Sequence, residues 1–440
     1  MGNPAQIKKG FAGSRSVYGF VSQIAMLNFF SLLFYWWFFM SISDKLTQRS
    51  QWEKFYAYVV EKESDTSEYL ERLRDFIDSE RYIDKALSVK DFSAFPHPEK
   101  MLINKSKSGK KRTVYRFPEE ENFILKFIAY RLKSYDGLFA PNLYSFRRKK
   151  MAKSAWDYIL KIKNLDSKYI YKVDISNYFI SVNTDKLLPE LKKALQEDAE
   201  LYCFLENLLK DKKVIYNNSV CEENKGILPG VPVSAFLANL YLKDLDRYFY
   251  NEGIIYLRYS DDIIVFADSC EELEQYIIKI RDFLEIMELK INSEKEAVIL
   301  PGCKWEFLGF SYCRGVVDIS EVSFRKLKAK MYRKAKALVR WSEKKGVKRE
   351  YAVRAFIKRF NAKLYDNPVH NELTWTRWYF PVINTTDTLK KIDAYIQDCI
   401  RFIATGKRTK SRYNFRYEDI KAFGYRNLVN EYYKVKEIKK

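Results

Sequence analysis

Histidine is nearly absent from this sequence, and its scarcity argues against several kinds of chemistry. Only His97 and His370 occur in 440 residues. Zinc proteases, Cys2His2 zinc fingers and histidine-based nucleases therefore have almost no ligands to work with. The six cysteines include no CxxC pair. This pattern favours reduced thiols in a cytoplasmic protein over a disulfide framework.

Glycine and proline are also scarce, and basic residues are abundant. The 15 Gly and 11 Pro exclude collagen-like and Gly/Pro-rich classes. Bulk disorder is excluded by 8 Trp, 33 Tyr and 31 Phe, because disordered chains are poor in aromatic residues. Lys and Arg number 78 against 57 Asp and Glu, a net charge of +21. Such a surplus favours a polyanionic partner, either nucleic acid or an acidic membrane.

The most apolar stretch of the sequence is residues 17–42, which follow several basic residues as a signal or anchor would. Gln23, Asn28 and Ser31 interrupt it, and its densest part is short for a membrane span. Three interpretations stay open: translation begins at Met40, the stretch is a docking helix, or it is a membrane anchor. We favour the first, and we expect no stable membrane association.

Apolar periodicity predicts helices, a basic hairpin and strands along the rest of the chain. Residues 45–90 and 119–134 place apolar side chains three and four apart among charges, which predicts helices. Residues 100–116 resemble a basic hairpin with its turn at Ser108-Gly109. Residues 168–173 alternate as a strand does, and one long helix is expected within 232–250.

Two further apolar runs, 254–259 and 263–267, flank Ser260-Asp261-Asp262 and predict a hairpin with acids at its tip. An amphipathic helix and short strands follow, so the order across 168–300 is βαββαβ. This order predicts a split antiparallel sheet of the ferredoxin-like type. From Val322 the sequence is mostly helical and basic, so the fold class is α+β.

Asp174 ends one predicted strand, while Asp261 and Asp262 lie at the hairpin tip. Carboxylates at strand ends without nearby His or Cys suit hard cations such as Mg²⁺. Two such ions can activate a 3′-hydroxyl and stabilise the leaving oxygen in phosphoryl transfer. An acidic pair in a turn is usually just a solvated hairpin, so these residues alone do not establish a metal site.

Seven motifs in order resemble those of reverse transcriptases. They are SKSGKKRTVYRFP (106–118), LYSFRRKKMAKSAW (143–156), VDISNYF (173–179), GILPGVPVSAFLANLYL (226–242), YSDD (259–262), LKINSEKEAVI (289–299) and FLGFSYCRG (307–315). The sequence is similar to bacterial defence-associated reverse transcriptases, a group that includes retron-like and group II intron-like enzymes. The resemblance implies a right-hand polymerase with fingers, a ferredoxin-like palm and a helical thumb.

The resemblance also implies a role for each matching residue at the metal site. Asp174 and Asp261 would bind the metals together with the Ile175 carbonyl, while Asp262 would support the site or bind metal. Lys295 would lie near the pyrophosphate as a general acid. The expected cofactor is Mg²⁺, with Mn²⁺ as a substitute.

Other matching residues would contact the nucleotide. Phe179 falls where an aromatic ring blocks the 2′-hydroxyl, and Lys111 and Arg112 would hold the triphosphate. Gly230 and Ser234 would pass close to template and nucleotide. Residues 307–315 would hold the primer end, and Asn239 would brace the helix that follows Ser234.

One motif departs from the family pattern. The usual Pro-Gln-Gly is replaced by Leu228-Pro229-Gly230, so the amide that approaches the nucleotide is missing. This departure bears on fidelity and template handling and leaves the metal chemistry unaffected. The alternatives to a reverse transcriptase are an RNA-dependent RNA polymerase and a non-catalytic, maturase-like RNA-binding protein. Phe179 and YSDD argue against the first, and the intact acids argue against the second.

The C-terminal region predicts an RNA-binding surface. Residues 324–341 combine an apolar stripe with Lys and Arg at most of the other positions. Arg325, Lys328 and Arg333 are the candidate RNA-binding residues, although a basic solvated helix would look the same. Residues 406–417 form a second basic, aromatic-interleaved stretch.

We expect four regions in the chain. They are an apolar extension (1–39), N-terminal helices and fingers (40–165), a palm (166–315) and a basic helical thumb with a C-terminal region (316–440). The partners expected for them are an RNA template, a DNA product and deoxynucleoside triphosphates. The resemblance further suggests a structured noncoding RNA as template and a role in antiviral defence.

Overall fold

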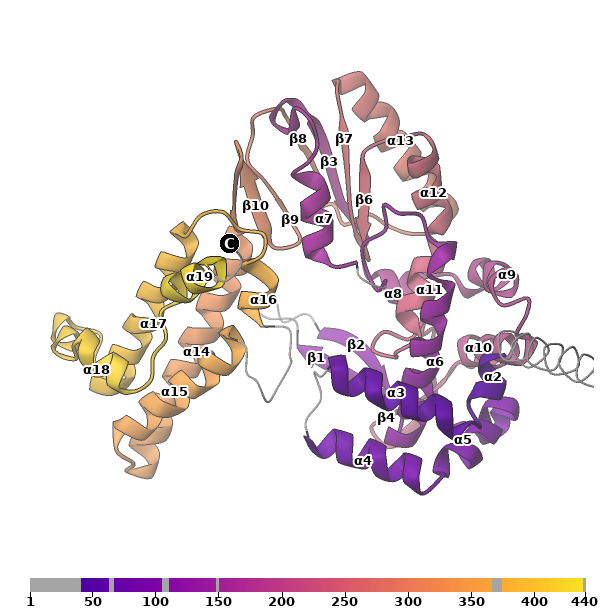
Figure 1. Ribbon diagram of the computed structural model, residues 1–440, viewed down its shortest axis with the longest axis horizontal. Helices are drawn as coiled ribbons and strands as arrows, with labels where there is room; N and C mark the ends of the chain where they lie inside the picture. The colour runs from indigo at the N-terminus through magenta and orange to yellow at the C-terminus, as the bar shows by residue number, and fades with distance from the viewer. Residues whose placement is uncertain (1–40, 63–66, 105–110, 148–149, 366–373, 438–440) are drawn as a thin grey trace, which may run out of the picture.

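A computed structural model describes residues 41–62, 67–104, 111–147, 150–365 and 374–437. Figure 1 shows the N-terminal helices and a small sheet on one side, a central sheet at the top, and the C-terminal helices on the other side. The predicted extension 1–39 lies outside the described residues. Within the described ranges, no helix combines the length and apolar composition that a membrane crossing requires.

The N-terminal lobe consists of helices that bury apolar faces around an aromatic centre. Its helices are α2 (Ile42–Lys45), α3 (Arg49–Lys62), α4 (Ser67–Asp78), α5 (Arg81–Lys90) and α6 (Glu119–Leu132). Trp52 is fully buried and stacks on Phe127 with 4.5 Å between ring centroids. The helices expected at 45–90 and 119–134 are confirmed.

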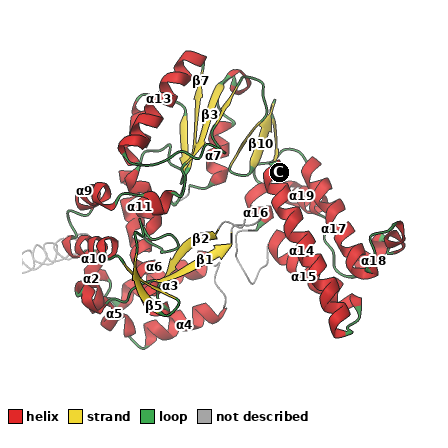
Figure 2. Ribbon diagram, turned by 180° about the vertical axis from the view of Figure 1, so that it is seen from behind, coloured by secondary structure: helices red, strands yellow, loops and turns green. Residues whose placement is uncertain are grey.

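A four-stranded sheet with the order β2-β1-β4-β5 belongs to the same side of the molecule (Figure 2). Its strands are β1 (Glu99–Asn104), β2 (Lys111–Arg116), β4 (Lys213–Tyr216) and β5 (Ser219–Glu222). β1 and β2 form the expected antiparallel basic hairpin, and its predicted turn lies outside the described residues. The β4–β5 hairpin, which the sequence analysis missed, joins the sheet through a parallel pairing of Glu99 with Ile215.

The central sheet has the order β6-β7-β3-β8, and every neighbouring pair is antiparallel. Its strands are β3 (Tyr169–Asp174), β6 (Tyr256–Tyr259), β7 (Asp262–Ala267) and β8 (Ala297–Ile299). The helices between β3 and β6, and then between β7 and β8, are α8 (Tyr178–Ser181), α9 (Thr184–Ala194), α10 (Ala199–Lys210), α11 (Ser234–Tyr241), α12 (Lys243–Asn251) and α13 (Cys270–Ile286). The predicted ferredoxin-like arrangement is confirmed.

The long helix expected within 232–250 is two helices. Leu242 separates α11 from α12 with φ −109° and ψ 11°, outside the helical region. The break lets α12 turn its own apolar face toward β6, with Leu245 and Phe249 buried.

Successive residues of β7 enter two different cores. Ile263, Val265 and Ala267 belong to the core that the N-terminal lobe shares with helices α9 to α13, whereas Ile264 and Phe266 belong to the core that includes the C-terminal half. Side chains alternate across a strand, so both faces of the central sheet are buried. Burial on both faces explains why this strand reads as an unbroken apolar run.

The C-terminal half begins with a three-stranded antiparallel sheet and continues as helices. The strands are β9 (Trp305–Phe307), β10 (Phe310–Cys313) and β11 (Val316–Ile319), in the order β11-β10-β9. The helices are α14 (Glu321–Lys345), α15 (Arg349–Leu364), α16 (Trp375–Tyr379), α17 (Asp387–Thr405), α18 (Tyr417–Ala422) and α19 (Leu428–Glu437). The earlier helix α7 (Ala152–Ile159) packs into this half, because Trp156 stacks on Trp305 at 5.3 Å.

Candidate active site

The three predicted acids lie together at one end of the central sheet. Asp174 is the last residue of β3 and pairs in register with Asp262, the first residue of β7. The Ile175 amide donates to the Asp261 carbonyl at 3.1 Å. Antiparallel pairing of β3 with β7 therefore brings together acids that are far apart in the sequence. The residues of the predicted metal set, Asp174, Ile175, Asp261 and Asp262, are neighbours in the structure.

Burial and mutual repulsion make this cluster electrostatically costly. Burial, followed by the charge of Asp174, raises the pKa of Asp261. Burial, followed by the charges of Asp261 and Asp174, raises the pKa of Asp262 to about 7. Carboxylates that raise one another's pKa are favourably placed to receive a cation.

Lys295 supplies the compensating charge within the described structure. Its Nζ lies 2.5 Å from Asp174 Oδ1, while Asn292 donates to Asp174 Oδ2 at 3.1 Å. Partial burial disfavours the ammonium, but the hydrogen bond and charge of Asp174 outweigh it and raise the pKa of Lys295. Asn292 also binds the Asp174 carbonyl through its own amide at 2.8 Å. The segment between α13 and β8 therefore holds both the carboxylate and the backbone carbonyl of Asp174.

The donor chemistry of the acidic cluster fits Mg²⁺. Hard carboxylate oxygens are the ligands that this ion prefers, and a cation would relieve the repulsion that raises the two pKa values. Among the described residues, no three Asp, Glu, His or Cys side chains already stand in a metal-binding arrangement. Asp174 is turned toward Lys295 and Asn292, so metal binding would have to replace the contact with Lys295.

A buried polar network supports the turn that carries Asp261. Arg258 and Asp246 are both fully buried, and the guanidinium donates twice to the carboxylate, at 2.8 and 2.5 Å. Arg258 also donates to the Ser260 carbonyl at 3.2 Å. The Ser260 amide donates to Ser145 Oγ at 2.8 Å. These bonds hold Ser260 in the left-handed region, at φ 61°.

Asn239 connects the same network to α11. Its Nδ2 donates to the Ser145 carbonyl at 3.0 Å, and its own carbonyl accepts from Arg258 at 3.3 Å. Asn239 is buried, and its side-chain amide links α11 to the segment that carries Ser145. Sequence analysis named Asn239 as a brace and missed Arg258, Asp246 and Ser145. Arg258 was detectable in principle, because a charged residue interrupts the apolar run of a strand expected to be buried.

Phe179 lies one residue into α8, half-buried, beside a second ring. The Phe146 ring meets it edge to face at 6.4 Å and 90°. The Phe179 carbonyl accepts a hydrogen bond from the Ile227 amide at 2.8 Å. A Cβ on Gly226 would lie only 2.3 Å from this carbonyl, so glycine is required where the chain passes behind the ring. The residue predicted to select the sugar is thus held by backbone contacts.

The Leu228-Pro229-Gly230 turn packs against β2. The Tyr115 amide donates to the Pro229 carbonyl at 2.8 Å, and a Cβ on Gly230 would lie 3.0 Å from the Tyr115 carbonyl. Ser234 is buried, and its hydroxyl donates to the Leu228 carbonyl at 2.6 Å. In this structure Ser234 shapes the turn, and its contact with a nucleotide stays a prediction.

The predicted triphosphate ligands lie on the hairpin that contacts this turn. Lys111 and Arg112 begin β2, and both side chains are exposed. The strand leads from them to Tyr115, where it meets Pro229. The structure therefore links them to the Gly230 turn, and their role in binding phosphate stays a prediction.

The candidate RNA-binding residues are set apart from the acidic cluster. Arg325, Lys328 and Arg333 are exposed on α14 and border a hollow that Tyr332 and Tyr395 also line. The Lys328 ammonium lies 4.8 Å from the centre of the Tyr395 ring on α17. The predicted site residues therefore fall into three groups. One is the acidic cluster, one is the nucleotide side, which is the set of predicted nucleotide contacts near β2, and one is the basic surface on α14.

Comparison with known families assigns the central part of the chain. The profile described as "Reverse transcriptase (RNA-dependent DNA polymerase)" matches residues 103–312. That range contains the acidic cluster, the Gly230 turn, Phe179 and Lys295. Residues 103–312, called the reverse transcriptase domain below, match this family over slightly less than half of the chain.

Two Escherichia coli proteins are similar to parts of the reverse transcriptase domain. Retron Ec86 reverse transcriptase is 32% identical over 117 residues, which cover 24% of this chain and 35% of the relative. Retron Ec48 reverse transcriptase is 26% identical over 148 residues, covering 32% of this chain and 33% of the relative. The chain spans about a third of the length of these relatives.

A solved apo telomerase from Candida tropicalis aligns with 74% of this chain and 59% of its own, at 14% identity and a TM-score of 0.45. The reverse transcriptase domain extends from β1 into β10. It contains the finger hairpin and the complete central sheet, and helices α14 to α19 follow it. The predicted right-hand polymerase, with fingers, a ferredoxin-like palm and a helical thumb, is confirmed.

Proposed function

We propose that this protein is an RNA-directed DNA polymerase that uses two Mg²⁺ ions. The observation that carries the proposal is the in-register pairing of Asp174 with Asp262 beside Asp261. Divalent ions bound there supply the charge that activates a 3′-hydroxyl and stabilises the leaving oxygen. Asp174, Asp261 and the Ile175 carbonyl would hold them, with Asp262 as a supporting ligand. The retron relatives and the matched family support this activity.

The remaining predicted residues would position the nucleotide. Lys111 and Arg112, both exposed, would reach the triphosphate of an incoming deoxynucleotide. Phe179 would close the space that a 2′-hydroxyl needs. Lys295 would leave Asp174 once a cation neutralises that carboxylate, and its Nζ would then be available to donate a proton to the pyrophosphate.

Asp261→Asn tests the chemistry. It should lower Mg²⁺-dependent deoxynucleotide incorporation by at least about a hundredfold, as expected when a transition-state charge contact is lost. RNA binding should stay close to wild type, and the melting temperature should not fall, because the substitution removes one of the charges that repel one another in the cluster. Asp268→Asn is the matched control, because Asp268 follows β7 in the same chain segment and its side chain is 75% exposed. Near-wild-type incorporation by Asp261→Asn would contradict the metal assignment. If the wild-type protein incorporated ribonucleotides alone, the activity would be that of an RNA polymerase.

We also propose that the template is one structured noncoding RNA and that its copy serves antiviral defence. Arg325, Lys328 and Arg333 support RNA binding because they are exposed beside tyrosine rings. RNA that copurifies with the protein should be dominated by one species. A copurified pool that mirrors cellular RNA, or phage protection that survives Asp261→Asn, would contradict this part of the proposal.

A further inference from the structure

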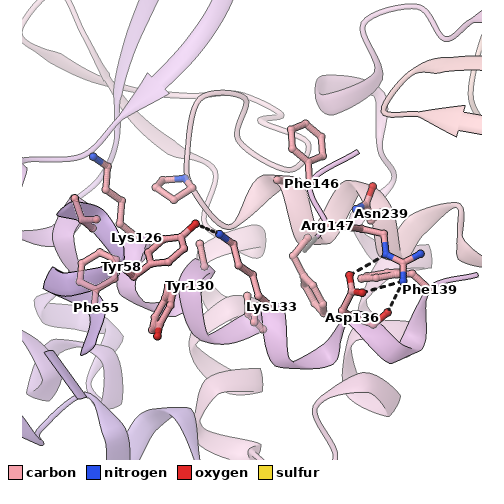
Figure 3. A pocket seen from close by; sticks show the side chains of 16 residues that line it. Phe55, Tyr58, Lys126, Tyr130, Lys133, Asp136, Phe139, Phe146, Arg147 and Asn239 are labelled. Atoms are coloured by element: carbon pink, nitrogen blue, oxygen red, sulfur yellow. Dashed lines mark hydrogen bonds and ion pairs between the residues drawn. The ribbon is translucent and has the colours of Figure 1, made fainter. Parts of the chain in front are cut away.

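A cavity of about 460 Å³ opens between the N-terminal lobe and α11. Its lining residues come from α3, α6, the 3-10 helix η2 (Lys133–Leu138), the segment 139–147, and α11 together with Pro232 before it. Figure 3 shows the labelled lining side chains along the cavity. The size falls within the roughly 300–1,000 Å³ of small-ligand sites. None of the predicted catalytic or nucleotide-binding residues lines it.

The lining is aromatic, with cations around it. Tyr58 and Tyr130 stack as tilted rings at 4.7 Å, and the Lys133 ammonium is hydrogen-bonded to the Tyr58 hydroxyl. Lys126 lies 4.0 Å from the centre of the Tyr69 ring and donates to its hydroxyl. Flat rings suit a planar heterocycle, and ammonium groups beside them suit a phosphate.

The opposite end of the cavity is fixed by an ion pair. Arg147 donates to both carboxylate oxygens of Asp136, at 2.8 and 2.9 Å, and to the Ala140 carbonyl at 2.6 Å. Among the described lining residues, Asp136 is the only acid, against Lys126, Lys133 and Arg147. The site therefore keeps a positive balance after the Asp136–Arg147 pair is formed.

Phe146 connects this cavity to the nucleotide side of the active site. The residue is 50% exposed, and its backbone has φ 57°, a left-handed value that is uncommon for an aromatic residue. The same ring lines the cavity and meets Phe179 edge to face. Pro232 and Ala235, which follow the Gly230 turn, form another part of the wall. One aromatic side chain thus separates the cavity from the residue assigned to the incoming sugar.

We propose that this cavity binds an unpaired nucleotide of the template strand, just ahead of the position being copied. The base would stack against the tyrosine and phenylalanine rings, and its phosphate would face Lys126 and Lys133. The inference rests on the proposed polymerase function, because the proposed occupant is the template strand that a polymerase would lead to Phe179. Such a pocket would hold the next base out of the way until the strand advances.

Template RNAs that each carry one 2-aminopurine, at successive positions beyond an annealed DNA primer, provide the test. Binding is measured without deoxynucleotides, by probe fluorescence and by anisotropy of a labelled primer. One position should show a fluorescence change that its neighbours lack. Ala129→Trp fills the cavity from α6 and should remove that signal. It should also weaken binding of overhanging templates roughly tenfold, the effect of about one stacked base, and leave blunt duplexes unaffected.

Ala199→Trp is the matched control, since Ala199 is exposed at the start of α10 and lines no part of the cavity. Phe146→Ala removes an exposed ring without filling space, so it tests the site if Ala129→Trp fails to fold. It should also erase the position-specific signal. Equal fluorescence at all positions, or unchanged overhang binding by both cavity variants, would overturn the proposal.

A free nucleotide could occupy the same cavity, because it also carries a base and a phosphate. If 2-aminopurine riboside triphosphate alone gives the signal that Ala129→Trp removes, the assignment to the template strand is wrong. Failure of the polymerase function would look different. Wild-type protein would then incorporate no nucleotide on these templates, while the overhang signal would still report on the cavity.

Discussion

Arg258 illustrates how a single residue can govern the geometry of the acidic turn without touching substrate. Its guanidinium neutralises Asp246 and binds the carbonyls of Ser260 and Asn239 in a region with no solvent access. A buried charge left without its partner costs far more than an exposed pair gains. The turn carrying Asp261 is therefore tied to α12 and α11.

Arg258→Met should destabilise the fold by about 3–5 kcal/mol, because Asp246 is left charged and buried. The double variant Arg258→Met/Asp246→Leu should recover much of this stability but not polymerase activity, since Ser260 still lacks its donor. Melting curves and the Mg²⁺ concentration at half-maximal activity measure the two effects. Lys210→Met is the control, because it breaks the exposed pair with Glu206 and should cost no more than about 0.5 kcal/mol. Recovery of full activity by the double variant would contradict the positioning role.

Phe179→Val should raise ribonucleotide incorporation relative to deoxyribonucleotide incorporation, because the smaller side chain leaves room for a 2′-hydroxyl. Competition assays with mixed triphosphates measure the ratio. Phe92→Val provides the comparison, since Phe92 is also half-buried but packs against Phe95 and Phe204 in the N-terminal lobe. Unchanged discrimination by Phe179→Val would place the gate at another residue.

At the scale of elements, the Gly226–Ser234 segment shows how glycine sets the distance between a turn and a strand. Gly230 combines φ 98° with a close approach to β2, so both backbone freedom and missing volume matter. Two other glycines separate these effects. Gly302 has φ 72° but open space around it, and Gly137 has open space and no positive φ.

Gly230→Ala should destabilise the protein by about 1–3 kcal/mol through strain and contact with Tyr115. It should also raise the deoxynucleotide concentration needed for half-maximal activity, because the turn adjoins the strand that carries Lys111 and Arg112. Gly302→Ala should cost about 1–2 kcal/mol from its backbone conformation alone and leave nucleotide binding intact. Gly137→Ala should be close to neutral. Equal effects of the three variants on stability would exclude the role of close packing.

Sequence patterns predicted those elements whose signals are local. The apolar runs around Ser260-Asp261-Asp262 identified β6 and β7, and the basic hairpin was visible from its composition. The β4–β5 hairpin was missed, although Asn217 and Asn218 offered a turn signal, and both adopt positive φ. Asp246 could not be assigned from sequence, because α12 presents it as one acid among several polar residues. Its partner Arg258 comes from another element, so only the tertiary fold pairs them.

At the scale of the whole molecule, basic side chains from two separate stretches of the sequence meet beside α14. Arg325, Lys328 and Arg333 lie on α14, and Arg408 reaches the same side from beyond α17, with its guanidinium 4.8 Å from the Tyr332 ring centre. The two basic stretches that were predicted separately, 324–341 and 406–417, thus meet through the Arg408–Tyr332 contact. A shared surface of this kind would suit the structured RNA proposed above as template.

Charge reversal at Arg325, Lys328 and Arg333 should weaken RNA binding and flatten its salt dependence. Loss of three phosphate contacts should reduce the slope of log affinity against log salt by roughly two units for single-stranded RNA. Filter binding across a salt series measures the slope. Reversal of three exposed lysines on α9 and α10, namely Lys192, Lys193 and Lys210, gives the same net charge change. An equal loss of affinity in both triple variants would indicate a general charge effect and no dedicated surface.

The central sheet, buried on both faces, has a consequence for how this protein is made. One face of β7 belongs to a core built from residues 42–289, whereas Ile264 and Phe266 belong to a core that also needs residues 305–432. During synthesis the sheet can form while much of its second face lacks a cover. At roughly 5–20 residues per second, that interval lasts for several seconds or more. A messenger RNA that ends between the regions encoding the two cores would yield a chain with an assembled acidic cluster and an exposed apolar face. Chaperones and proteases would recognise such a chain.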